Sequence, residues 1–121
     1  MAFWHDKLLV ANTYDDSISL IDTTTNTVEK TFNLGLPIRV PSEHKSAYGA
    51  GPNSIAVDES NDLAYVAFYN ANAIGVIDLH ATTYPIIGMI PVGYAPSSVV
   101  LEKNDNVLIV ANDKGLSLIH I

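Results

Sequence analysis

An internal repeat constrains this chain more than any other feature. Residues 51–58 (GPNSIAVD) return as residues 95–102 (APSSVVLE), and residues 65–68 (YVAF) return as residues 109–112 (IVAN). Pro52 and Pro96, 44 residues apart, mark this offset. Residues 9–22 form an earlier, partial copy of the segment that begins at Tyr65, and an insertion lengthens the interval between these two copies. Self-similarity at a period of this size is typical of repeat architectures.

Each repeat contains four short apolar runs separated by turn residues. In the complete copy these runs are residues 54–57, 63–67, 73–77 and 86–92, and polar stretches such as residues 15–17 and 70–72 lie between the runs of each copy. Runs of this length bounded by Asp, Asn and Gly predict antiparallel strands joined by tight turns, with almost no helix. Four strands in about 40 to 50 residues correspond to one propeller blade, and closed propellers have about four to eight blades.

The predicted fold class is therefore all-β, an incomplete β-propeller of antiparallel four-stranded blades, with about two to two and a half blades present. Residues 7–35 are assigned to three strands of one blade, residues 52–95 to a complete blade and residues 96–115 to two strands of a third. Units of this kind bury their faces only against neighbours. We therefore expect the two outermost sheets to expose apolar surface and the chain to associate or fold poorly when isolated.

The residues that define the repeat are interpreted as structural. They form the second strand of each copy and the proline that opens the first strand: Val10, Ala11, Asn12, Pro52, Val66, Ala67, Pro96, Val110, Ala111 and Asn112. Asp22 and Asp78 recur at equivalent strand ends, where an acid usually closes a turn through backbone hydrogen bonds. Asp15 and Asp16 are interpreted in the same way and not as calcium ligands, because the further spaced acids of a calcium loop are missing.

The insertion at residues 36–51 is the most informative irregular segment. It accounts for the interval from Gly35 to Gly93 being longer than the interval from Pro52 to Pro96. Loops of this length without regular structure of their own are usually functional or mobile. It contains Arg39, His44 and Lys45 in a chain with 6 Lys and Arg against 13 Asp and Glu. Two interpretations stay open: these three residues contact an anion or a partner, or the segment is a surface excursion that packs over a neighbouring blade, which is the interpretation we favour.

Composition excludes several other functions. The net charge of −7 argues against a nucleic-acid partner, and the absence of cysteine excludes disulfides and thiolate chemistry. No apolar run reaches the length of a transmembrane helix. His5, His44 and His80 show no metal-ligand spacing and are interpreted as isolated surface histidines. No nucleophile elbow or phosphate-binding glycine loop occurs, so no catalytic, cofactor or metal site is predicted.

The segments 65–67 (YVA), 9–12 (LVAN) and 109–112 (IVAN), with the following Ile-x-x-Ile-Asp pattern, resemble the YVTN family of bacterial and archaeal extracytoplasmic propeller repeats. Phe68 departs from the motif asparagine. Residues 88–99 and 110–116 also resemble the propeller part of bacterial proteins that join such repeats to a phosphoesterase domain of the alkaline-phosphatase superfamily.

The resemblance implies a non-catalytic scaffold outside the cytoplasm, whose partners are further blades and a C-terminal enzymatic domain. Its catalytic residues would lie in that domain. The alternatives are part of a quinoprotein-like propeller oxidoreductase and a cell-surface structural repeat protein.

Residues 116–121 (LSLIHI) are interpreted separately. They match the translation of a transposon adapter used to prepare DNA libraries, so we expect the native sequence to differ after Gly115. The alternative is an apolar tail that continues a strand.

Overall fold

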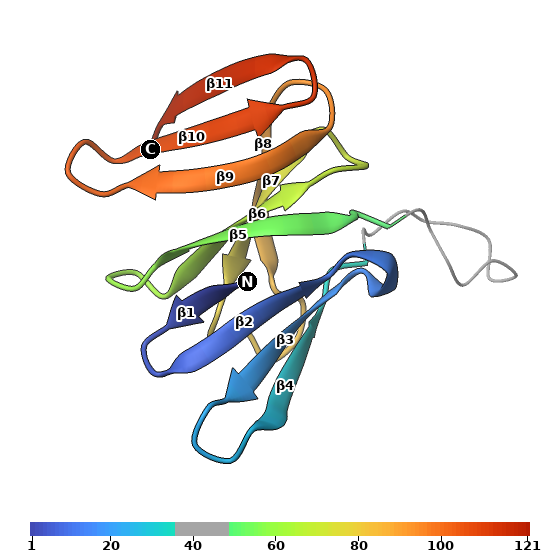
Figure 1. The fold of residues 1–121 in the computed structure, drawn as a ribbon, viewed down its shortest axis with the longest axis vertical. Coiled ribbons are helices and arrows are strands. Elements are labelled where there is room, and N and C mark those ends of the chain that lie inside the picture. The colour runs from blue at the N-terminus through green and yellow to red at the C-terminus, as the bar shows by residue number, and fades with distance from the viewer. Residues whose placement is uncertain (36–48) are drawn as a thin grey trace, which may run out of the picture.

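The chain folds into three antiparallel sheets that follow one another along its long axis (Figure 1). This computed structural model describes residues 1–35 and 49–121. The first sheet contains β1 (Ala2–Trp4), β2 (Lys7–Asn12), β3 (Ser17–Asp22) and β4 (Thr27–Asn33). The second contains β5 (Pro52–Asp58), β6 (Leu63–Phe68), β7 (Ala73–Asp78) and β8 (Ile86–Pro91). The third contains β9 (Pro96–Glu102), β10 (Val107–Asn112) and β11 (Gly115–His120).

The predicted strands of the complete repeat are confirmed, since the four apolar runs coincide with β5 to β8. The one helical element among the described residues is a single 3-10 turn, η1 (Thr13–Asp15). Asp16, Asn72 and Asp62 have the positive φ angles of 49°, 52° and 51° that short polar residues tolerate in turns.

The strand count differs from the sequence analysis at both ends. The first sheet has four strands because Ala2–Trp4 pairs with β2, and the third has three because Gly115–His120 pairs with β10. The short β1 was missed because it pairs over only three residues and is joined to β2 by a shorter turn than the equivalent turn of the second sheet. β11 coincides with the residues assigned above to an adapter-derived tail.

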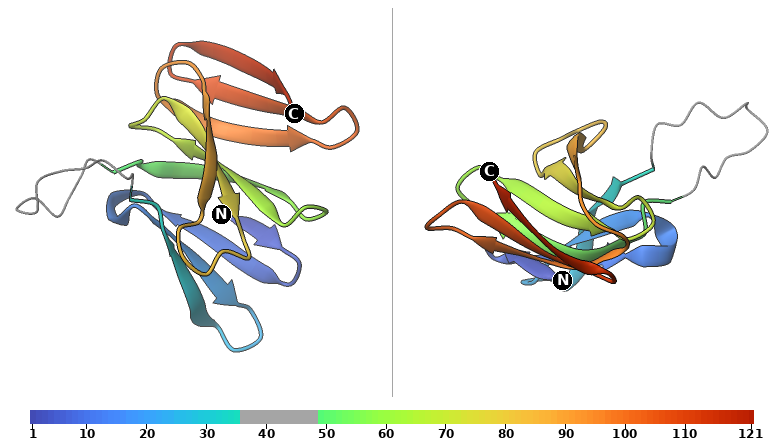
Figure 2. Two further views of the ribbon diagram at one scale, coloured as in Figure 1. Left: turned by 180° about the vertical axis from the view of Figure 1, so that it is seen from behind. Right: turned by 90° about the horizontal axis from the view of Figure 1, so that it is seen from above.

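Two hydrophobic clusters hold the sheets together. Side chains of β2, β3 and β4 meet side chains of β5, β6 and β7 in the first cluster, which includes the fully buried Leu9, Ile18 and Phe68. The second cluster joins the other face of the second sheet to the third sheet and includes Ile74 and Leu108. The strand β5 contacts both β1 and β9, so the first strands of the three sheets lie next to one another. Figure 2 shows this stacking from behind and from above.

Phe68 replaces asparagine because the second sheet packs differently at this position. In the first sheet Asn12 Nδ2 donates to Ser19 Oγ at 2.8 Å, and in the third Asn112 Nδ2 donates to Ser117 Oγ at 3.1 Å. The residue that corresponds to these serines in the register of the second sheet is Gly75. A Cβ at Gly75 would lie 2.2 Å from Cζ of Phe68. In the second sheet, Phe68 and Gly75 together thus replace the polar Asn–Ser pair of the other two sheets, and the phenyl ring packs directly on the glycine.

Candidate functional site

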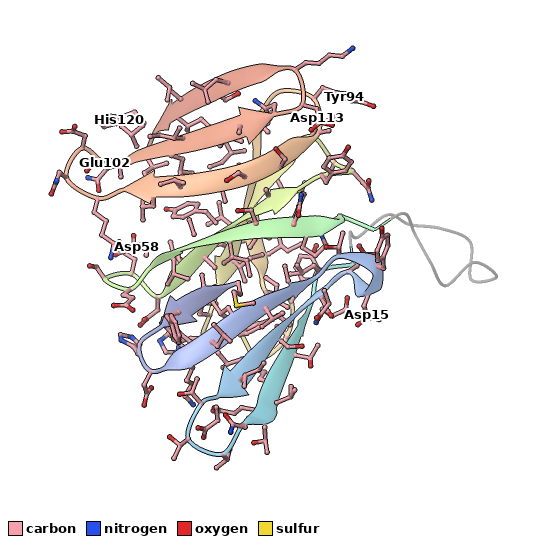
Figure 3. All side chains as sticks on the ribbon, in the orientation of Figure 1. Asp15, Asp58, Tyr94, Glu102, Asp113 and His120 are labelled. Carbon is pink, nitrogen blue, oxygen red and sulfur yellow. The ribbon has the colours of Figure 1, made fainter. Side chains whose placement is uncertain are left out.

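Turns and connections divide between two opposite edges of the molecule. One edge carries the β2–β3, β6–β7 and β10–β11 turns, the β8–β9 connection, and the ends of β4 and β5 between which the insertion lies in the sequence; we call it the insertion edge. The other carries the β1–β2, β5–β6 and β9–β10 turns together with the β3–β4 and β7–β8 connections, and we call it the opposite edge. Figure 3 shows Asp15, Tyr94 and Asp113 at the insertion edge and Asp58, Glu102 and His120 at the opposite edge.

A repeated anchor fixes the connections at the insertion edge. The carbonyl oxygen of Asp16 accepts a hydrogen bond from Leu34 N at 2.8 Å, and Asp16 Oδ1 accepts one from Gly51 N at 3.0 Å. Asn72 makes the same pair of bonds in the second sheet, with Val92 N at 3.0 Å and Ala95 N at 2.9 Å. Asp16 therefore binds both ends of the long insertion, as Asn72 binds both ends of the short connection between β8 and β9. These backbone hydrogen bonds explain why an aspartate is found at position 16.

A groove of about 490 Å³ lies at this edge between the first and second sheets. Its described lining consists of Thr13, Tyr14, Gly51, Asn53, Tyr69 and Asn70. Tyr14 is fully exposed and Tyr69 is 38 % exposed. The backbone of the groove wall is fixed by Thr13 Oγ1, which donates to the carbonyl of Pro52 at 2.8 Å. None of these six lining residues is charged, so the groove offers aromatic faces, amides and a hydroxyl.

The polar surface continues from the groove to the third sheet. Tyr69 donates its hydroxyl proton to Asp113 Oδ2 at 2.9 Å, and this bond raises the pKa of the Tyr69 phenol. Nζ of Lys114 lies 5.8 Å from the ring centre of Tyr94, which is 62 % exposed. Three exposed tyrosines, one from each of three connections, therefore follow one another along the insertion edge.

A second polar cluster links two sheets at the opposite edge. Asp62 Oδ1 accepts hydrogen bonds from Trp4 Nε1 at 2.8 Å and from the His5 ring at 3.2 Å, and Asp62 Oδ2 bonds the His80 ring at 2.8 Å. The Trp4 bond, then those from His80 and His5, lower the pKa of the Asp62 carboxyl to about 2. These bonds tie β1 of the first sheet to two turns of the second sheet.

The interpretation of His5 and His80 as isolated was wrong, since both contact Asp62. The three residues belong to three turns that the topology brings to one edge, and recognition of β1 would have placed His5 there. Within residues 1–35 and 49–121, no group of three His, Asp or Glu side chains is arranged to hold a metal ion.

The other residues singled out by the sequence lie as follows. Asp22 Oδ1 accepts a hydrogen bond from Thr24 N at 2.8 Å, and Asp78 Oδ1 accepts one from His80 N at 2.9 Å. The Val-Ala pairs lie in β2, β6 and β10, and Pro52 and Pro96 open β5 and β9 as buried residues. Arg39, His44 and Lys45 lie outside the described residues. No helix in the described part of the chain is long and apolar enough to cross a membrane.

The short polar residues of the sequence predicted the turns of the insertion edge, but nothing in the sequence predicted the groove between them. Tyr14 and Tyr69 are not equivalent positions of the repeat, because the residue that corresponds to Tyr69 in the first copy is Thr13. The aromatic lining therefore became visible only from the stacking of the sheets.

Comparison with known proteins supports the fold and assigns no family. No family model matches the chain, and no curated protein matches it. Among solved structures, hydrazine synthase of Kuenenia stuttgartiensis is similar with a TM-score of 0.74 and 20% identity, over 97% of this chain and 30% of that chain. A functionally unknown protein of Desulfotomaculum acetoxidans has a TM-score of 0.68 and 14% identity, over 96% and 34%. Saccharomyces cerevisiae Sqt1 has a TM-score of 0.63 and 12% identity, over 94% and 32%.

Hydrazine synthase and Sqt1 match through propeller-type folds. The chain spans about a third of the length of each of these three proteins. At these identities the likeness concerns the fold alone. The chain is thus all-β and forms part of a β-propeller, each of its three sheets corresponding to one blade.

Proposed function

We propose that this chain is a non-catalytic binding scaffold of the propeller class, with its binding surface at the insertion edge. The observation that carries the proposal is the groove between the first two sheets, whose walls are made by Tyr14 and Tyr69 and by uncharged polar groups. Its volume of about 490 Å³ lies in the range of small-molecule sites. Tyrosine is well suited to binding because it offers a large, rigid ring with a polar tip.

The ligand class follows from the lining. Six uncharged residues favour a neutral ligand with both apolar faces and hydroxyl groups, which describes an oligosaccharide. Sugar rings would stack on Tyr14 and Tyr69, while Asn53, Asn70 and Thr13 would exchange hydrogen bonds with hydroxyl groups. Asp113 supports this arrangement, because it holds the Tyr69 hydroxyl in a fixed direction.

Binding of neutral oligosaccharides tests this proposal. Ligand-detected NMR of the full chain with cellohexaose, chitohexaose and maltohexaose is expected to show saturation transfer from at least one of them. The double variant Tyr14→Ala/Tyr69→Ala is expected to reduce that affinity at least about tenfold, the size of effect expected for loss of two anchor side chains. Tyr84→Ala is the matched control, since Tyr84 is 43 % exposed but lies in the β7–β8 connection at the opposite edge. Absence of transfer from all three, or equal loss in both variants, contradicts the assignment.

The insertion forms the second part of the proposed binding surface. Its ends are held by Asp16, directly beside the groove residue Gly51. We propose that Arg39, His44 and Lys45 contact an anion or a partner beside the neutral ligand of the groove. In the parent protein, Arg39→Ala/Lys45→Ala is expected to weaken partner binding; unchanged binding and activity would exclude the contact.

The finer identity of the parent protein is also a proposal. The repeat resembles the YVTN family, and the chain spans only about a third of similar solved chains, which supports a parent with further blades. We propose an extracytoplasmic protein in which the propeller accompanies a phosphoesterase domain. The gene locus tests this: a signal peptide upstream and clustered Asp, His and a Ser or Thr nucleophile downstream are expected. A cofactor absorption band in the purified parent would instead indicate an oxidoreductase.

A further inference from the structure

Each sheet of this chain has two faces that can bind another sheet. We call the face toward earlier residues the N-side face and the face toward later residues the C-side face. In the second sheet both faces are covered. Its N-side face carries a cross-strand row that packs on the first sheet, namely Val57, Ala64, Ile77 and Ile86. Its C-side face carries a row that packs on the third sheet and includes Ala56, Tyr65 and Val76.

The equivalent rows of the first and third sheets lie at the two ends of the stack, where no other sheet of the chain covers them. The N-side face of the first sheet carries a register row made of Phe3, Leu8, Ile21 and Val28. The C-side face of the third sheet carries a row made of Val100, Ile109 and Leu118. Phe3 is 63 % exposed and Leu118 is 67 % exposed. Leu8 is equivalent to Ala64 and Ile109 to Tyr65 in the repeat, so these are the inter-sheet surfaces of the repeat itself.

One of these two exposed faces is an N-side face and the other is a C-side face, so they are the two kinds of face that pack against each other within the chain. Twice within the chain, a C-side row of one sheet meets an N-side row of the next sheet in a buried cluster. Contiguous exposed apolar rows of this sort mark interaction surfaces. In a longer chain, further sheets of the same repeat would cover them. When the 121 residues are produced as they stand, a second copy presents the same surfaces.

We propose that two copies of this 121-residue chain associate head to tail and close a ring of six sheets. The C-side face of the third sheet of each copy covers the N-side face of the first sheet of the other. Such a heterologous contact produces a closed ring when its rotation closes and an open polymer when it does not. Two copies give six sheets, within the usual four to eight, whereas one copy gives three and three copies give nine.

Light scattering coupled to size exclusion tests this proposal. The full chain is expected to elute with twice the 13.0 kDa mass of one chain, without larger species. Ile109→Asp/Leu118→Asp blocks the C-side face and Phe3→Asp/Val28→Asp blocks the N-side face, and each variant is expected to have the mass of one chain. Ile87→Asp is the matched control, because Ile87 is 60 % exposed but belongs to neither row, and this variant is expected to remain dimeric.

The two blocked variants also distinguish the head-to-tail contact from a symmetric one. A symmetric contact uses only one kind of face, so one of the two variants would then remain dimeric, whereas the head-to-tail contact requires that both lose the dimer. Far-UV circular dichroism of each variant confirms that the strands are retained. A monomeric full chain, an open series of larger oligomers, or a dimer that persists in either blocked variant would overturn the proposal.

Discussion

The exchange of an Asn–Ser pair for Phe68 and Gly75 gives a quantitative test of how the repeat is packed. In the first and third sheets an asparagine amide bonds a serine hydroxyl on the next strand, and in the second sheet a buried phenyl ring occupies the space of both side chains. We expect Phe68→Asn and Gly75→Ser to destabilise the chain singly and to compensate each other when combined.

The magnitudes follow from the local geometry. Gly75→Ser places a Cβ 2.2 Å from the Phe68 ring, and forcing extra atoms into a packed core costs about 1–3 kcal/mol. Phe68→Asn removes a fully buried ring, at about 3–5 kcal/mol, and leaves an amide that lacks the serine partner, at about 1–3 kcal/mol more. The double variant relieves the clash and supplies the serine partner of the asparagine. Its loss of unfolding free energy is therefore expected to be at least about 1 kcal/mol smaller than the sum of the losses in the two single variants.

Urea unfolding at one fixed protein concentration measures these free energies. Gly88 provides the matched control, because a Cβ there would meet only side-chain carbons of Val76 at 3.9 Å or beyond. Phe68→Asn combined with Gly88→Ser is therefore expected to be additive. If Phe68→Asn and Gly75→Ser also add to within about 0.5 kcal/mol, the two positions are not coupled and the packing argument is refuted.

Two further predictions concern the edges of the sheets. The carboxyl of Asp62 has a pKa of about 2, below its ordinary 3.8, so its contribution to stability is present above about pH 4 and is lost as the pH falls toward 2. The midpoint of unfolding is therefore expected to fall as the pH falls over this range, and the fluorescence emission of Trp4, the only tryptophan, is expected to change. Asp62→Asn should flatten both pH profiles. A flat wild-type profile, or the same flattening in Asp105→Asn, contradicts the stabilising role of the Asp62 carboxylate. Asp16→Ala is expected to cost about 1–2 kcal/mol in urea unfolding, because it removes the bond to Gly51 N and puts alanine in a left-handed conformation. Asp16→Asn should be nearly neutral, as Asn72 serves the same purpose in the second sheet, and an equal loss in both variants would count against the anchor.

The repeat predicted most of the fold because strand period and turn chemistry are local. The strands between residues 52 and 91 and the left-handed turns at Asp16 and Asn72 follow from alternation and from short polar residues at fixed offsets. The strand at Ala2–Trp4 has only three residues, too few to show an alternation, and its turn to Lys7 is shorter than the equivalent turn of the second sheet.

The candidate sites were less predictable because they arise between sheets. Tyr14 and Tyr69 come from turns of different sheets, and Asp62 collects its partners Trp4 and His80 from distant parts of the chain. None of these residues belongs to a recognisable motif in the sequence, and only the stacking of the sheets brings them together. The departure of Phe68 from the repeated asparagine was visible in the sequence, but its compensation by Gly75 required the register.

Throughout the chain, the C-side row of one sheet packs against the N-side row of the next sheet. Nuclear Overhauser spectroscopy of the labelled full chain measures this directly. We expect contacts from the Tyr65 ring to methyl groups of Leu108 and Val110, together with backbone contacts across the Ile109–Leu118 pair. Sequential amide contacts typical of helix in these segments, or a Tyr65 ring without contacts to the third sheet, would contradict it.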